Sequence, residues 1–232
     1  ISANNDRELG RLIGQAFRSV DETGIVMMET HEEPETVIER IEGIQYDKGF
    51  LHNHFITNKE KGVSELENPK VLIVDSKVDN IRKIQGVLEH VIKKGYPLLV
   101  IADVEQQVMT ALAMNKVKGN IKVNMLEAPT YGISRKETLD DLAMLTGATV
   151  INEDLGDDMD LIQPEHLGTC LKAVSTEIET IIQIEETPEE VTELIKGIEK
   201  QIKETSNPNI KIRHEKRLAR LLAKVAIVKV GA

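Results

Sequence analysis

The chain has 232 residues, of which 39 are acidic and 29 basic, and its formal net charge is -10. Because nucleic-acid affinity comes largely from basic side chains that displace counterions, this balance argues against a nucleic-acid partner. No apolar run approaches the roughly 20 residues of a membrane-spanning helix, and no signal peptide is recognised, so we expect a cytoplasmic protein with no membrane partner.

The first 44 residues predict one helix and two strands. Apolar residues recur at helical spacing over residues 5–20, and Asn5 or Asp6 is available to cap the first turn. The apolar face of this helix comprises Leu9, Leu12, Ile13, Phe17 and Val20. Strands are expected at 25–28 and 36–44. Gly43 and Gly49 bracket the short segment 44–48, where a change of direction is expected because glycine adopts backbone angles that branched residues cannot.

Strands and helices alternate from residue 71 onward. Apolar strands are expected at 71–75, 98–102, 121–126 and 148–151, and helices at 79–94, 104–117 and about 134–145. Such alternation predicts an α/β fold with a mainly parallel sheet flanked by helices.

The segment 104–117 has more apolar side chains than one buried helix face can use. Val104, Val108 and Leu112 form one stripe suited to packing on a sheet, whereas Met109 and its neighbours Ala113 and Met114 point elsewhere. Such a helix is either buried on several sides or contributes its second face to a partner, for which methionine is well suited. The helix at 79–94 is similarly rich in apolar residues, and the two helices could lie side by side.

The last third of the chain predicts two more strands and two charged helices. The strands are expected at 169–174 and 178–184, and the single cysteine, Cys170, would be a buried, inert thiol. Thr187-Pro188-Glu189-Glu190 has the pattern of a capping box at a helix start. A break at 206–209 separates this helix from a second one at about 211–224. Both ends of the sequence look cut from a longer chain.

The sequence contains no recognisable catalytic motif. Glycine-rich nucleotide motifs, a phosphate-binding loop, His-Glu-x-x-His and paired cysteines are all missing from the sequence. His52 and His54 would share one face of a strand, but no third ligand is evident, so we expect no metal site. Asp157, Asp158 and Asp160 are better interpreted as a solvated turn than as a cation site. We therefore expect no catalytic residues, and a small-molecule enzyme with a site at the carboxyl ends of the strands is disfavoured.

Several blocks of sequence together resemble one family. They are Ile-Ser-Ala-Asn at 1–4, Ile-Glu-Gly-Ile-Gln-Tyr-Asp-Lys-Gly-Phe at 41–50, Asn-Ile-Arg at 80–82, Pro-Leu-Leu-Val-Ile-Ala at 97–102, Ala-Pro-Thr-Tyr-Gly at 128–132, Leu-Thr-Gly-Ala-Thr-Val-Ile at 145–151 and Val-Lys-Val-Gly-Ala at 228–232. In this order they resemble the large subunit of the bacterial group I chaperonins, the GroEL family, over essentially the full chain.

The resemblance implies a GroEL-like apical domain with a small α+β segment of the intermediate domain. Residues 1–41 would be the intermediate-domain segment, 42–225 the apical domain, and 226–232 the returning intermediate-domain strand. Gly43 matches a hinge glycine of the family. Ala223-Lys224 stands where the family has a double glycine, which leaves the hinge motion open.

The resemblance also implies that the chain binds non-native polypeptides and the mobile loop of a GroES-like co-chaperonin in an apolar groove. The nine positions that match the family's groove, called here the predicted groove residues, are Phe50, His52, His54, Phe55, Gln85, Leu88, Met109, Ala113 and Met114. Gln85 and the two histidines make this groove more polar than is usual in the family. The alternative is a structural or assembly module whose groove binds one fixed partner.

In the family, ATP is bound and hydrolysed mainly by parts of the subunit outside this segment. The resemblance therefore implies that this chain is not an enzyme and holds no cofactor. The parent subunit would form a homo-oligomeric ring and hydrolyse ATP with Mg.

Overall fold

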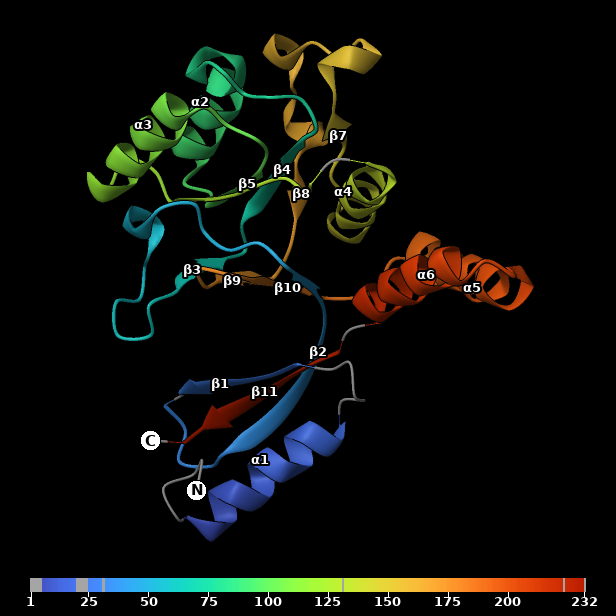
Figure 1. The fold of residues 1–232 in the computed structure, drawn as a ribbon. Helices are drawn as coiled ribbons and strands as arrows, with labels where there is room; N and C mark the ends of the chain where they lie inside the picture. Colours follow the sequence, from blue (N-terminus) through green and yellow to red (C-terminus); the bar gives the residue numbers. More distant parts are fainter. Residues whose placement is uncertain (1–5, 20–24, 31, 131, 223, 232) are drawn as a thin grey trace. The chain divides into compact units, whose positions relative to one another are not determined.

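A computed structural model describes residues 6–19, 25–30, 32–130, 132–222 and 224–231 (Figure 1). The contacts within the chain divide it into two compact units, which are described separately. Unit 1 comprises residues 1–44 and 193–232, and unit 2 comprises residues 45–192. The domain limits at 41/42 and 225/226 follow from the family resemblance. They are a separate prediction, which the division into units does not test.

Unit 1 contains a three-stranded arrangement covered by the first helix. Strand β1 (Ile25–Thr30) pairs in parallel with β11 (Lys224–Val230), which pairs antiparallel with β2 (Val37–Tyr46). Helix α1 (Arg7–Ser19) packs on these strands through Ala16, which lies in a small core with Ala226 and Val228. The predicted Asp6 cap is confirmed, because its Oδ1 accepts the backbone N–H groups of residues 8 and 9. Asn5 and Val20 lie outside the described residues.

The helical period wrongly assigns one residue, Phe17, to the buried face of α1. Phe17 is exposed, whereas Ile13 and Ala16 are buried. The small side chain of Ala16 allows the helix to approach the strands closely, so the buried stripe is centred there and not on the larger aromatic ring.

The two long helices near the carboxyl end are α5 (Glu189–Glu204) and α6 (Pro208–Leu221). Helix α6 begins at Pro208, within the predicted break at 206–209. Its start is fixed by Asn207, whose side chain accepts the N–H of Asn209, and by Pro208 in the first turn. The predicted extension of this helix to residue 224 is wrong, since Lys224 already belongs to β11.

Unit 2 is built on a parallel sheet with strand order β6-β5-β4-β7. Its strands are β4 (Lys70–Val74), β5 (Leu98–Ile101), β6 (Val123–Leu126) and β7 (Val150–Ile151), and the short β8 (Gly168–Thr169) pairs antiparallel with β4. The predicted mainly parallel sheet is confirmed. The connecting helices are α2 (Gln85–Lys94), α3 (Gln106–Val117) and α4 (Ile133–Thr146).

The strand order determines which helices share a face. From β4 through β5 to β6 the chain moves along the sheet in one direction, and from β6 it returns to β7 on the other side of β4. Because such crossovers are right-handed, α2 and α3 cover one face and α4 covers the other. Figure 1 shows α2 and α3 together on one side of β4 and β5, with α4 on the opposite side.

A second, antiparallel set of strands in unit 2 has the order β10-β9-β3. These are β3 (Ser64–Glu67), β9 (Lys172–Ser175) and β10 (Thr180–Ile184). The strand predicted at 169–174 is therefore two strands, β8 and β9, which belong to different sheets. Cys170 lies between them and is buried, as predicted.

Short 3-10 helices complete unit 2. They are η1 (Asn53–Phe55), η2 (Ile81–Ile84), η3 (Glu153–Leu155), η4 (Met159–Leu161) and η5 (Pro164–His166). The solvated turn predicted around residues 157–160 is confirmed, since Asp158 caps η4 by accepting the N–H of Asp160 and these aspartates are exposed. Among the described residues, no helix is both long and apolar enough to cross a membrane.

Candidate functional site

The predicted groove residues come from three segments of unit 2 that pack on one apolar core. Four of them are buried members of this core: Phe50 before η1, Phe55 within η1, Leu88 on α2 and Ala113 on α3. Met109 and His52 are half-buried. The remaining three, Gln85, His54 and Met114, are exposed.

The segment 50–55 is not the strand that the sequence predicts. Phe50 forms a single antiparallel bridge with Leu126, and its N–H donates to the Thr176 carbonyl at 3.0 Å. The chain then turns into η1, where His52 Nδ1 accepts the N–H of His54 at 3.1 Å. The prediction that these histidines share one face of a strand is wrong, although their ring centroids lie only 4.5 Å apart. The hydrogen bond that the His52 side chain accepts from the backbone stabilises this turn, and such local bonding competes with strand formation.

Helix α3 follows the sequence prediction in part: Met114 points away from the buried stripe, but the prediction that Ala113 does so is wrong, because Ala113 is buried in the same core as Val108 and Leu112. Val108 and Leu112 are buried on the sheet, whereas the side chain of Met114 is 42% exposed and Met109 lies at the edge of the core. The carboxyl end of α3 is fixed to the segment after η1, because Lys116 Nζ donates to the Ile56 carbonyl at 2.6 Å. Burial, followed by the nearby charge of Lys59, lowers the pKa of Lys116.

Other apolar side chains of this region are not among the predicted groove residues. Leu51, Ile56 and Ile81 are half-buried against the same core as Met109. Ile92 on α2 and Val117 on α3 are exposed. The helical period already marks Ile81 and Ile92 among the surplus apolar residues of the helix predicted at 79–94, and it could also have found Val117. The single residues flanking η1 carry no such pattern.

A cavity of about 960 Å³ opens at the carboxyl ends of the parallel strands. Its lining joins Leu51 and Met109 to polar residues that follow the strands. The polar lining residues are Asp75, Ser76, Lys77, Asp79, Lys83, Asp103, Gln106, Glu127, Arg135, Asn152, Glu153 and Asp154. Ligands of open α/β sheets bind at this edge, next to the point where the strand order reverses.

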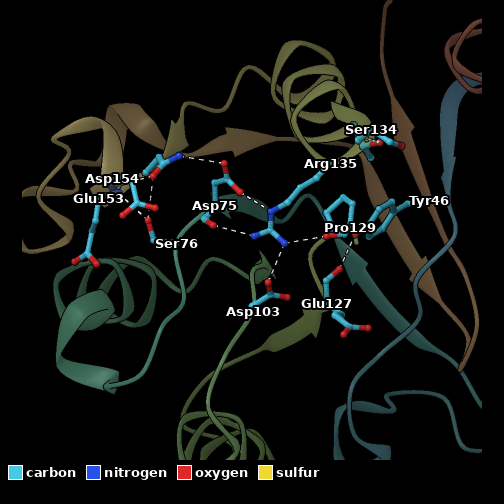
Figure 2. Close-up of polar contacts among 12 residues, drawn as sticks. Tyr46, Asp75, Ser76, Asp103, Glu127, Pro129, Ser134, Arg135, Glu153 and Asp154 are labelled. Carbon is cyan, nitrogen blue, oxygen red and sulfur yellow. Dashed lines mark hydrogen bonds and ion pairs between the residues drawn. The ribbon is translucent and has the colours of Figure 1, made fainter. Parts of the chain in front are cut away.

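A network of hydrogen bonds joins the ends of all four parallel strands at this cavity (Figure 2). Arg135 bonds to Asp75 after β4, to Asp103 after β5 and to the Pro129 carbonyl after β6. After β7, Asn152 donates to the second carboxylate oxygen of Asp75 at 3.1 Å. Within the described residues, no group of three or more His, Cys, Asp or Glu side chains is placed to hold a metal ion.

The same edge of the sheet is joined to the end of β2. The Tyr46 hydroxyl donates to the Glu127 carbonyl at 2.6 Å. Burial, with the neighbouring Asp47 charge, raises the pKa of Tyr46, so the phenol stays a neutral donor. Sequence reasoning missed Tyr46, Asp75, Asp103 and Arg135 as a group, although both aspartates closely follow buried parallel strands, which is a usable signal.

Gly43, the predicted hinge residue, lies inside β2, next to the boundary between the two units after residue 44. Its role as a hinge stays a prediction.

Comparison with known proteins assigns the chain to the chaperonin 60 subunits, the large subunits of the group I chaperonins, and confirms the resemblance found in the sequence. Chaperonin 60 subunit beta 3, chloroplastic, of Arabidopsis thaliana is 39% identical over 234 residues. Chaperonin 60 subunit beta 2, chloroplastic, of the same plant has the same identity over the same length. Both matches cover 100% of this chain but only 39% of the relative. No family model matches the chain.

Both relatives are named as chloroplastic proteins. For this chain, the cytoplasmic location stays a prediction.

Proposed function

We propose that this chain is the polypeptide-binding part of a chaperonin subunit, with a GroEL-like apical domain. It captures non-native polypeptides and the mobile loop of a co-chaperonin on α2, α3 and the segment around η1. The whole subunit assists protein folding in a homo-oligomeric, ATP-dependent ring, and ATP and Mg bind to parts of the subunit outside this chain. The homology to chaperonin 60 subunits over the entire chain supports this proposal.

The observation that carries the proposal is the apolar surface of α3 that the core does not use. Met114 is partly accessible, at 42% exposed, and Met109 lies between the core and the cavity at the carboxyl edge. Unfolded chains expose apolar side chains, and burial of each CH₂ group contributes about 0.8 kcal/mol without requiring a particular sequence. The flexible thioether of methionine adapts to partners of varied shape.

The nine predicted groove residues then divide into two roles. Met109, Met114, Gln85, His52 and His54 are accessible enough to contact a bound chain. The buried members support them from the core, and these are Phe50, Phe55, Leu88 and Ala113. The three polar contact residues make capture more selective than an entirely apolar groove would be.

The test is to measure binding of two labelled ligands to this chain by fluorescence anisotropy. One is reduced, carboxymethylated lactalbumin, which is permanently unfolded, and the other is a co-chaperonin mobile-loop peptide. We expect both to bind and both to be lost in Met109→Glu and Met114→Glu. Ile178→Glu is the matched control, because Ile178 is an exposed apolar residue of unit 2 outside the predicted groove.

Two outcomes would contradict the proposal. Binding of the loop peptide with indifference to unfolded lactalbumin would support the alternative of a module with one fixed partner. Failure to bind either ligand when the chain is displayed in multiple copies on a bead, where multivalency compensates for weak single contacts, would exclude capture altogether.

A further inference from the structure

Arg135 lies in the first turn of α4 and holds the loops that follow three parallel strands. Its Nε donates to Asp75 Oδ1 at 2.6 Å, and its Nη2 donates to the Asp75 carbonyl at 2.8 Å. Its Nη1 donates to Asp103 Oδ2 at 2.9 Å and to the Pro129 carbonyl at 2.8 Å. Figure 2 shows the guanidinium group at the centre of these partners. We call this arrangement the Arg135 clamp.

The loops that the clamp holds are those that lead into α2 and α3. Asp75 directly follows β4, whose loop runs to η2 and α2, and Asp103 follows β5 shortly before α3. The two loops are also bonded to each other. Val78 donates its N–H to the Asp103 carbonyl at 2.8 Å, and Glu105 donates its N–H to the Val78 carbonyl at 2.9 Å. The starts of both helices are therefore connected to one guanidinium group.

The position of this cation is unusual on electrostatic grounds. The amino end of a helix carries partial positive charge, so a cation in its first turn is unfavourable there unless other groups compensate. Only 12% of the Arg135 side chain is exposed, and burial alone would lower its pKa. The hydrogen bonds that Arg135 donates to Asp75 and Asp103 outweigh burial and raise its pKa, so the group stays charged. The planar guanidinium group donates hydrogen bonds to both loops at the same time. The single ammonium group of lysine cannot reproduce this geometry.

We propose that Arg135 is a positioning residue for polypeptide capture, which sets the relative placement of α2 and α3 from the opposite face of the sheet. This inference rests on the proposed function. The clamp contacts the loops and not the bound chain, so it acts by keeping Met109 and Gln85 in the arrangement that a ligand meets. Such pre-organisation lowers the ordering cost of binding.

The experiment uses the whole chain and compares four variants. Arg135→Met removes the planar guanidinium group and the charge, and Arg135→Lys keeps only the charge. Asp103→Asn weakens the clamp at the α3 loop alone. Lys172→Met is the matched control, because Lys172 is similarly shielded, at 15% exposed, and pairs with Glu67 away from this edge. Affinity for carboxymethylated lactalbumin and backbone hydrogen exchange are measured for each variant.

We expect Arg135→Met to weaken binding about tenfold or more, which corresponds to a modest loss of pre-organisation. Hydrogen exchange should accelerate at residues 76–84 and 103–109. Arg135→Lys should fall between the wild type and Arg135→Met, and Asp103→Asn should accelerate exchange chiefly at 103–109. Lys172→Met should leave the affinity and both segments unchanged even where its midpoint of unfolding falls.

A merely structural role would give a different result. If Arg135→Met lowers the unfolding midpoint but leaves both the affinity and the exchange of these two segments unchanged, the clamp does not position the helices and the proposal is wrong. If the wild type binds no lactalbumin, the proposed function fails. In that case the clamp is still tested by hydrogen exchange, because unchanged exchange in Asp103→Asn and Arg135→Lys would refute it. The same two variants provide the test if Arg135→Met does not fold.

Discussion

Leu88 and Met114 are both predicted groove residues, but the structure gives them different surroundings. The Leu88 side chain is 8% exposed and belongs to the core of unit 2, whereas Met114 is 42% exposed. A contact residue of the predicted groove would be partly exposed, and for Leu88 this expectation is wrong because the residue is buried. Substitutions at the two sites separate the effects of the core from those of the proposed binding surface.

We predict that Leu88→Glu lowers the free energy of unfolding by about 3 kcal/mol or more, because it places a carboxylate in an apolar core. Met114→Glu should change it by less than about 0.5 kcal/mol. Urea denaturation of the two variants beside the wild type provides the measurement. Equal stability of Leu88→Glu and the wild type would show that this side chain leaves the core at little cost.

Cys170 gives a prediction that depends on pH. Burial raises the pKa of its thiol from 9.0 to about 12, although a hydrogen bond from the Lys172 backbone opposes this. The folded thiol is therefore neutral at pH 8, and we expect an aromatic disulfide reagent to modify it only after unfolding. An accessible cysteine would react in the native protein within minutes.

The sign of the linkage follows from the raised pKa. The unfolded thiol ionises first as the pH rises, so the stabilisation is complete below pH 9.0 and is lost on rising toward about pH 12. The wild type should lose stability relative to Cys170→Ala across this window, by up to about 1.4 kcal/mol per pH unit. Urea titrations of both proteins at several pH values measure the difference. A constant difference would contradict the raised pKa.

At the scale of elements, the sequence predicts most of the parallel sheet because its signals are local. Buried strands such as β4 and β5 are continuous apolar runs, and the helices between them repeat with the helical period. The fold of 50–55 depends on contacts that lie far apart in sequence. Phe50 bonds to Thr176 and bridges to Leu126, and no pattern near residue 50 announces either partner.

In the candidate site, too, local sequence patterns predict some residues, whereas others depend on contacts between distant parts of the chain. Apolar excess on α3 marks Met109 and Met114 in the sequence, since a helix face can be counted. The burial of Leu88 and Ala113 depends on how α2, α3 and η1 pack on one core, which periodicity does not determine. The Arg135 clamp joins residues 75, 103 and 135, and only the order of the parallel strands brings these together.

Gly49 supplies a prediction for the element that carries the segment 50–55. A Cβ atom at this position would lie 2.1 Å from the Thr176 carbonyl oxygen and 2.2 Å from the Glu177 carbonyl carbon. Gly49→Ala should therefore displace the segment and cost about 2 kcal/mol or more of stability. Gly86 in α2 is the control, because a Cβ there meets nothing within 4 Å. Gly86→Ala should stabilise by up to about 1 kcal/mol, and equal effects of both substitutions on urea unfolding would contradict the close approach at Gly49.

At the scale of the whole molecule, the two compact units differ in their apolar cores. The core cluster of unit 2 draws all of its residues from between Phe50 and Leu167 and includes large side chains such as Phe55 and Leu72. The cluster that joins α1 to the strands of unit 1 is centred on Ala16, Ala226 and Val228. Since stabilisation grows with the apolar area buried, we expect unit 2 to be the more stable unit.

We therefore predict that residues 45–192, expressed alone, fold and unfold at the same urea concentration as unit 2 in the whole chain. In the whole chain, backbone amides of β1 and β11 should exchange with solvent faster than those of β4 and β5, because unit 1 opens first. Hydrogen exchange read by mass spectrometry compares the four strands in one sample, and the fragment serves as the reference for unit 2. An unfolded fragment, together with uniform protection of all four strands, would mean that the two units unfold as one cooperative body. Stability of the proposed polypeptide-binding part would then depend on the strands contributed by both ends of the chain.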